Sequence, residues 1–143
     1  MARFQTGQLV EAESSVRKSL EYQEPLVVDE PADVALRSSL GGMHNNLGMI
    51  LEEMRRMDEA GESFRQAIEH QKIAHLQAAD VARYRNFLNK HYYNYGRILR
   101  NLGRIDDAIQ VALARRDLWP DNPQRLASVD EELALAGRVV SSE

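Results

Sequence analysis

The four histidines are the side chains best suited to acid–base or metal chemistry, but their spacing does not assemble a site. His70 and His75 are five residues apart, which puts them roughly 140° apart around a helix and on different faces. His44 is replaced by Tyr92 at the equivalent position further along the chain, and helix packing explains that position without chemistry. The chain has no cysteine and no His-Glu-x-x-His sequence, so the usual zinc-ligand patterns are missing. We expect neither a metal nor a cofactor.

Other catalytic patterns are missing as well. The acidic pairs Glu52-Glu53 and Glu131-Glu132 are adjacent, so the two carboxylates of each pair diverge on a helix. The sequence contains no Gly-x-Gly-x-x-Gly, no phosphate-binding loop and no nucleophile elbow. We predict that the protein is not an enzyme and has no catalytic residues, because a helical enzyme would need an acid or base cluster that the sequence does not supply.

The composition is that of a folded chain with no preference for nucleic acid or lipid. Hydrophobic residues make up 43% of the 143 residues and charged residues 28%, which is typical of globular proteins. The formal net charge is −4 without a basic block, whereas general nucleic-acid binders carry a basic stripe. No apolar run approaches the roughly 18 residues that a membrane span needs. We expect no nucleic acid and no membrane as partners, and the lack of cysteine fits a reducing, cytoplasmic location.

Internal repetition with a period of about 48 residues is the strongest signal in the chain, and such a period indicates an array of similar supersecondary units. Gly48 recurs as Gly96, and Leu51 recurs as Leu99. A turn segment appears three times with the same period, and its alanines are Ala12, Ala60 and Ala108.

Apolar residues within each unit follow the spacing of three and four that marks an amphipathic helix. One such stripe consists of Leu40, Met43, Leu47, Ile50, Leu51 and Met54. No segment keeps the strict alternation of an exposed strand, so we predict an all-α fold. We expect Asp33 and Asp80 to cap helix N-termini, Pro25 and Pro31 to bracket a loop, and Gly103 to form a left-handed turn.

These residues resemble the signature of the tetratricopeptide repeat family. The first match consists of His44, Leu47-Gly48, Leu51, Met57, Ala60, Phe64 and Ala67. The second match consists of Tyr92, Tyr95-Gly96, Leu99, Gly103-Arg104-Ile105, Ala108 and Trp119-Pro120. Three residues depart from the signature: Ala112 replaces its large aromatic, Arg115 a small residue, and Arg55 the turn glycine. The resemblance implies antiparallel helix hairpins stacked as a right-handed α-solenoid, in a long-helix variant because the family repeat usually has roughly 34 residues.

The resemblance also implies how the chain is organised. It suggests one domain over residues 1–143, with a half repeat at 1–24, repeats at 32–78 and 80–119, and a capping helix at 122–140. Gly48 and Gly96 would lie where the partner helix crosses, opposite Ala60 and Ala108, so that the two helices approach closely.

The two ends of the chain suggest that it is a fragment of a longer protein. The half repeat would leave an uncovered apolar edge at Leu9, Val16 and Leu20, and exposed repeat ends tend to be capped or paired. Near the other end, the pattern Asn-Pro-x-Arg-Leu…Glu-Leu-Ala-Leu-Ala resembles the repeat tails of large bacterial serine/threonine kinases, although the chain has no kinase motif. This second resemblance implies a parent protein that acts in signalling.

In the tetratricopeptide family, the first helix of each repeat lines a concave groove that binds a peptide. The corresponding residues here are Asn45, Met49, Glu52 and Glu53 in one repeat, and Lys90, Tyr93, Asn94, Arg97, Arg100 and Asn101 in the next. Arg97 and Arg100 share a face with Tyr93 and Asn94, and arginines beside an amide and an aromatic ring suit a peptide that carries carboxylates or phosphate. The alternative is that the arginines form a solvated helix face.

We therefore predict a scaffold that binds a peptide or partner protein in this groove. The family's carboxylate clamp for chaperone tails is incomplete here, because Asn45 and Met49 occupy the positions where its lysine and asparagine are expected. The alternative function is self-association, with a homodimer formed through the truncated first repeat.

Overall fold

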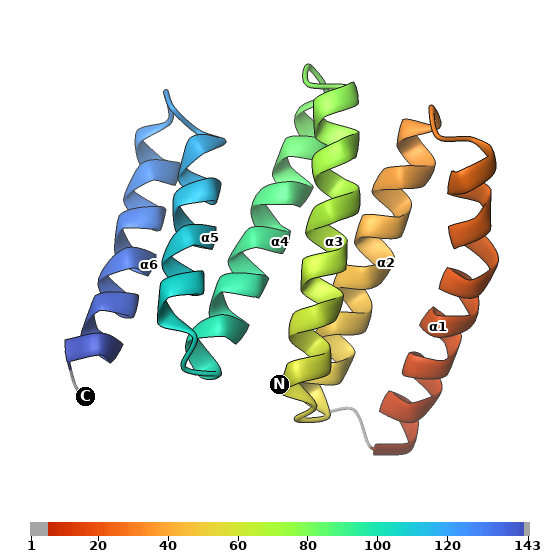
Figure 1. Cartoon of the computed structure of the whole chain (residues 1–143), viewed down its shortest axis with the longest axis horizontal. Helices are drawn as coiled ribbons and strands as arrows, with labels where there is room; N and C mark the ends of the chain where they lie inside the picture. The colour runs from red at the N-terminus through yellow and green to blue at the C-terminus, as the bar shows by residue number, and fades with distance from the viewer. Residues whose placement is uncertain (1–5, 142–143) are drawn as a thin grey trace. The chain divides into compact units, whose positions relative to one another are not determined.

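The computed structural model describes the backbone of residues 6–141 and the side chains of residues 6–137. This part of the chain is all-α, as the sequence predicts, and its helices follow one another along the chain (Figure 1). They are α1 (Thr6–Asp29), α2 (Val34–Glu53), α3 (Met57–Gln77), α4 (Ala82–Asn101), α5 (Ile105–Asp117) and α6 (Pro123–Ser141).

The chain divides into two compact units, Met1–Leu88 and Asn89–Glu143, which we call unit 1 and unit 2. In unit 1, α2 packs against α1 on one side and against α3 on the other, and in unit 2 α5 packs against α6. Consecutive helices within each unit run antiparallel (Figure 1). The predicted helix hairpins are therefore confirmed within each unit.

A glycine allows α2 and α3 to approach closely in unit 1. A Cβ atom on Gly48 would lie 2.6 Å from Cε1 of Phe64, which is itself fully buried. Ala60 and Ala67 of α3 are also fully buried, but the atoms nearest to Gly48 belong to Phe64 and not to Ala60, which was expected opposite this glycine. The lack of a side chain at Gly48 thus leaves room for the Phe64 ring between α2 and α3.

The α2–α3 turn and the α4–α5 turn have the same backbone conformation. Arg55 has φ 63° and Gly103 has φ 77°, so both occupy the left-handed region. In each turn the following amide donates back to a carbonyl five residues earlier, from Arg56 to Leu51 at 2.9 Å and from Arg104 to Leu99 at 2.8 Å. This is the Schellman arrangement that ends a helix, and Arg55 adopts it although it is not a glycine.

The first helix differs from the sequence-based expectation at its C-terminal end. Pro25 lies inside α1, which continues to Asp29, so the prediction that Pro25 begins a loop was wrong. Proline leaves the carbonyl of Glu21 without its helical partner, and water can satisfy that carbonyl because Glu21 and Pro25 are both exposed.

The two predicted N-caps have different outcomes. Asp33 caps α2, with Oδ1 accepting from the amide of Leu36 at 3.0 Å. Asp80 does not immediately precede a helix, because α4 begins at Ala82. The cap prediction is therefore confirmed at Asp33 and wrong at Asp80.

The predicted apolar edge of α1 is turned inward. Leu9 and Leu20 are buried and Val16 is half-buried, so these residues form the contact with the rest of unit 1 rather than an open edge. The exposed large apolar residues of α1 include Tyr22 (73% exposed) and Val28 (79% exposed).

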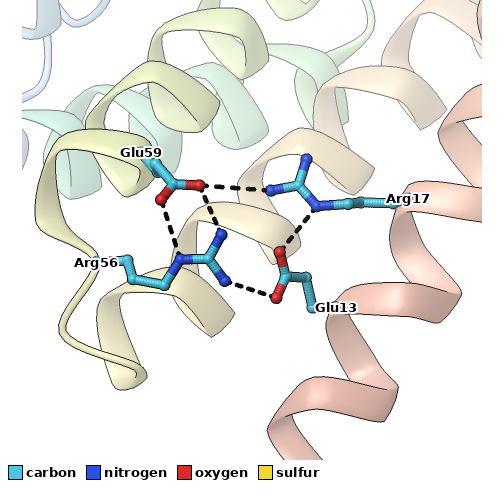
Figure 2. A network of polar contacts seen from close by, with 4 residues as sticks. All are labelled: Glu13, Arg17, Arg56 and Glu59. Atoms are coloured by element: carbon cyan, nitrogen blue, oxygen red, sulfur yellow. Dashed lines mark hydrogen bonds and ion pairs between the residues drawn. The ribbon is translucent and has the colours of Figure 1, made fainter.

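An ion-pair network also holds α1 in place (Figure 2). Glu13 of α1 accepts from Arg17 at 2.9 Å and from Arg56 at 2.7 Å, and Arg56 also donates to Glu59 of α3 at 2.7 Å. Burial opposes ionisation of Glu13, but the hydrogen bonds from Arg17 and Arg56 outweigh it and hold the pKa of Glu13 below its ordinary value. The network joins α1 to the start of α3.

Candidate functional site

Helix α4 is basic in a chain that is acidic as a whole. It contains Arg83, Arg85, Lys90, Arg97 and Arg100 and no Asp or Glu, although the full chain has 22 acidic and 18 basic residues. The net charge of the whole chain does not reveal this local asymmetry. A count of charge along each expected helix would have found it.

The part of α4 that belongs to unit 2 presents three of the predicted binding residues at one surface. Lys90 is exposed, Tyr93 is 43% exposed and Arg97 is half-buried, and their spacing of three and four places them on one face of the helix. The Arg97 guanidinium carbon lies 5.9 Å from the centre of the Tyr93 ring. We call Lys90, Tyr93 and Arg97 the α4 face.

Asn94 and Arg100 are less accessible than the sequence suggests. Asn94 is buried, and its Oδ1 accepts from Nη1 of Arg97 at 3.0 Å. Arg100 is directed to the interior of unit 2, where its Nη1 lies 3.3 Å from Oε1 of Glu132 on α6. Asn94 therefore positions Arg97, while Arg100 forms an internal ion pair.

A buried polar cluster lies beneath the α4 face. Nη2 of Arg115 on α5 donates to Oε2 of Glu132 at 2.9 Å, and both side chains are only 3% exposed. The Arg115 guanidinium also lies 5.5 Å from the Tyr93 ring centre. Asn89 Oδ1 accepts from Arg115 at 3.4 Å and from Trp119 at 2.9 Å. Tyr93 thus contacts both the half-buried Arg97 and the buried Arg115.

The predicted binding residues of unit 1 lie on α2. Met49 is 44% exposed, Glu52 is half-buried and Asn45 is buried. Nδ2 of Asn45 lies 3.7 Å from the Met49 sulfur, within hydrogen-bonding range for that atom. Met49 is thus the accessible member of this group, and Asn45 supports it from below.

Comparison with protein-family models identifies the repeat. The model described as "Tetratricopeptide repeat" matches residues 42–71 and 91–113. These two segments are tetratricopeptide repeats. The first covers most of the α2–α3 hairpin, and the second covers the C-terminal half of α4 and most of α5. No curated protein matches the chain.

The two tetratricopeptide repeats fill their helix crossings differently. In the first, Phe64 packs on Gly48, and the small Ala67 lies one turn further along α3. In the second, the equivalent positions hold Ala112 and Arg115, and a Cβ atom on Gly96 would lie 2.7 Å from Oε1 of Glu132. A carboxylate of α6 therefore lies against the glycine of the second repeat, where the first repeat has an aromatic ring.

Tetratricopeptide repeats are protein–protein interaction modules and are typically non-catalytic. No helix within residues 6–141 is long and apolar enough to cross a membrane. Among the described side chains, no group of three or more histidine and acidic residues could hold a metal ion.

Two histidines for which the sequence predicts no contact, His44 and His70, lie side by side in unit 1. The rings of His44 and His70 stack at 5.4 Å, and Nε2 of His44 lies 3.1 Å from Glu24 of α1. Burial lowers the pKa of both histidines, because it removes water from the charged form of each ring. The carboxylate of Glu24 raises the pKa of His44 and so opposes this effect in part. These contacts link α1, α2 and α3. Residue spacing within a single helix cannot predict them, because the three residues come from three different helices.

Proposed function

We propose that this chain is a protein-interaction module that binds an acidic segment of a partner protein on the α4 face. The observation that carries the proposal is the stacking of Arg97 on the exposed Tyr93 ring, with Lys90 one turn away, on a helix without any acidic residue. These residues lie within or beside the second tetratricopeptide repeat.

The geometry suits a carboxylate or a phosphate presented by an extended peptide. A guanidinium that already rests on an aromatic ring and on an amide oxygen loses little rotamer freedom when it binds an anion. Arg97 has both supports, in Tyr93 and in Asn94. Lys90 adds a mobile ammonium group, which accepts anions in many geometries. Tyr93 supplies the apolar contact that a peptide backbone or side chain needs.

We propose that Met49 and Glu52 provide the corresponding contacts in the first repeat. Methionine is a flexible apolar side chain that adapts to different partners, and Met49 is exposed on α2. Asn45 is assigned an indirect role here, because it is buried beneath Met49.

Fluorescence anisotropy with a labelled peptide of alternating Glu and Gly tests the α4 face. Loss of a charge-assisted hydrogen bond is worth about 1.5–3 kcal/mol, so we expect Arg97→Glu to weaken binding by roughly tenfold or more. Tyr93→Ala should also weaken it. The matched control is Arg116→Glu, which makes the same charge change at an exposed position of α5. Equal weakening by the control, or none from Arg97→Glu, would refute the assignment.

A second candidate function is self-association through the exposed apolar residues of α1. Tyr22 and Val28 are the two most exposed large hydrophobic residues of that helix, and exposed apolar groups on one element favour an interface. We expect sedimentation of the chain to reveal dimers that Tyr22→Ser weakens. A monomer at every concentration tested, up to the solubility limit, would exclude this candidate.

A further inference from the structure

The C-terminal end of α1 has a charge opposite to that of the basic helix α4. From residue 19 to residue 36 the sequence contains no Lys or Arg, and its acidic residues are Glu21, Glu24, Asp29, Glu30 and Asp33. Helix α4 has the reverse composition, with five basic residues and no Asp or Glu. One chain therefore carries two segments of complementary charge.

The negative charge at this end of α1 is not neutralised within the part of the chain that the structure describes. Glu21, Asp29 and Glu30 are exposed, and none of them forms an ion pair with a described side chain. The last turn of α1 has no basic residue, although the C-terminal end of a helix carries partial negative charge and favours cations. Pro25 also leaves the carbonyl of Glu21 without a helical donor. This end of the helix therefore suits a cationic partner.

Exposed apolar side chains lie among these carboxylates. Tyr22 and Leu26 are both exposed, and the spacing of four and three residues that joins them to Asp29 places all three on one face of α1. The segment can therefore offer an apolar group and a carboxylate together, which is the combination that the α4 face is proposed to bind. We call the exposed residues Glu21, Tyr22, Leu26, Asp29 and Glu30 the acidic end of α1.

The charges along the two helices have similar spacing. Lys90 and Arg97 are seven residues apart with Tyr93 between them, so the two cations are separated by roughly 10 Å along α4. Glu21 and Asp29 are eight residues apart, which is roughly 12 Å along α1. A series of cation, aromatic ring and cation on α4 thus matches a series of carboxylate, apolar group and carboxylate on α1.

We propose that the acidic end of α1 in one copy of the chain binds to the α4 face of a second copy. This inference rests on the proposed function, because it names the acidic segment that the α4 face binds. It differs from self-association through α1 alone, since the two copies contribute different surfaces. Such contacts between unlike surfaces either close into a ring of two or more copies or extend into an open chain.

The ion pairs of this contact are exposed, and exposed ion pairs are individually weak. We therefore expect a weak association that depends on chain concentration and on salt. Sedimentation equilibrium of the full chain at several concentrations, in about 10 mM and about 1 M NaCl, measures it. Association should be present at low salt and lost at high salt.

One charge reversal on each surface tests the two halves of the contact. Lys90→Glu and Asp29→Lys should each weaken association by roughly fivefold or more, because each replaces an attraction with a repulsion. Asp29→Lys should not lower Tm, since a cation near the C-terminal end of a helix is favourable. The matched controls are Arg116→Glu on α5 and Glu11→Lys near the start of α1, which make the same changes in net charge at exposed positions. Both controls should associate like the wild-type chain.

Mixing the two variants tests whether the two surfaces bind each other. In an equimolar mixture, the unchanged α4 face of the Asp29→Lys chain meets the unchanged α1 of the Lys90→Glu chain, and the two reversed charges also attract each other. The mixture should therefore recover the association that each variant lacks alone. Association through α1 alone would instead survive Lys90→Glu.

The inference is overturned if the chain remains monomeric at low salt up to its solubility limit, if only one of the two variants weakens association, or if the mixture fails to restore it. The anisotropy assay with the peptide of alternating Glu and Gly keeps this inference separate from the proposed function. Peptide binding by a chain that does not self-associate overturns the inference alone. Absence of peptide binding counts against the proposed function, whatever the oligomeric state.

Discussion

Gly48 of α2 lies directly beneath the ring of Phe64 of α3, so close that a Cβ atom would be 2.6 Å from Cε1 and 2.7 Å from Cδ1. Phe64 is fully buried and cannot swing out to make room. The distance between α2 and α3 in the first repeat is therefore set by the absence of a side chain at position 48.

Gly48→Ala should lower the free energy of unfolding by about 1–3 kcal/mol, because the extra methyl group forces the ring or the helix to shift. Gly42→Ala in the same helix is the control, since a Cβ atom there meets nothing within 4 Å. That variant should be neutral or up to about 1 kcal/mol more stable, from helix propensity alone. Urea denaturation measures both, and equal effects would show that the crossing is not tight.

The recurrence of glycines and alanines in both repeats predicts a close helix approach at Gly48, but it places Ala60 opposite the glycine, where the structure has Phe64. It does not predict the contact at Gly96, because Ala112 and Arg115 remove the aromatic partner and the replacement comes from α6. Helical spacing assigns residues to a face but does not reveal which residue of another helix lies opposite. For the same reason Arg100 was expected on the outer surface, although Glu132 pairs with it inside unit 2.

Arg55→Gly should stabilise the protein. Arg55 has φ 63° at the position that Gly103 fills in the second repeat, and a left-handed conformation costs a non-glycine residue about 1–2 kcal/mol. The added flexibility of glycine in the unfolded chain offsets part of this, so we expect a net gain of about 0.5–1 kcal/mol. Thermal unfolding should show a higher Tm.

The control for this turn is Lys72→Gly, at an exposed position inside α3. Glycine has no conformational advantage within a helix, so the change should destabilise by about 1 kcal/mol. If Arg55→Gly lowers Tm as Lys72→Gly does, the left-handed turn is not a source of strain.

His91 should make the folded state sensitive to mild acid. It is 3% exposed and neither ring nitrogen has a hydrogen-bond partner, and burial, aided by Lys90, lowers its pKa to about 4. The unfolded chain takes up this proton near pH 6.5 and the folded chain only near pH 4. Stability is therefore lost as the pH falls between these values, by about 3 kcal/mol in total.

His91→Met isolates this contribution, because Met43 occupies the equivalent position of the preceding repeat and methionine carries no proton. The difference in unfolding free energy between the variant and the wild-type chain should grow from pH 7 to pH 4. The contributions of carboxylates that titrate in the same pH range are the same in both proteins, so they cancel in this difference in unfolding free energy. A difference that stays constant with pH would mean that His91 has the same pKa in the folded and the unfolded chain.

Glu13→Gln should weaken the docking of α1. The carboxylate joins Arg17 and Arg56 (Figure 2), but most of the network is open to solvent, so we expect a loss of about 1 kcal/mol or less. The loss should shrink in about 1 M NaCl, where screening is strong. Glu11→Gln, an exposed position on the same helix, should have no measurable effect. A loss of equal size at low and high salt would argue against an ionic origin.

The α4 face shows how far a site can be predicted from this sequence. Tyr93 and Lys90 lie at the surface, as their spacing within the repeat predicts. Asn94 was expected to meet the ligand, but it is buried and supports Arg97. One turn of helix contains both exposed and buried polar residues, and only the packing of the neighbouring helices decides which is which.

The most direct test of the central claim is to locate where an acidic peptide binds. In ¹H–¹⁵N NMR spectra of the full chain titrated with the peptide of alternating Glu and Gly, we expect the largest shifts at the amides of Lys90, Tyr93 and Arg97 and at the side chain of Arg97. These shifts should disappear in Arg97→Glu and persist in Arg116→Glu. Largest shifts on α1, or a set of shifts unaffected by Arg97→Glu, would contradict the assignment of the α4 face as the binding surface.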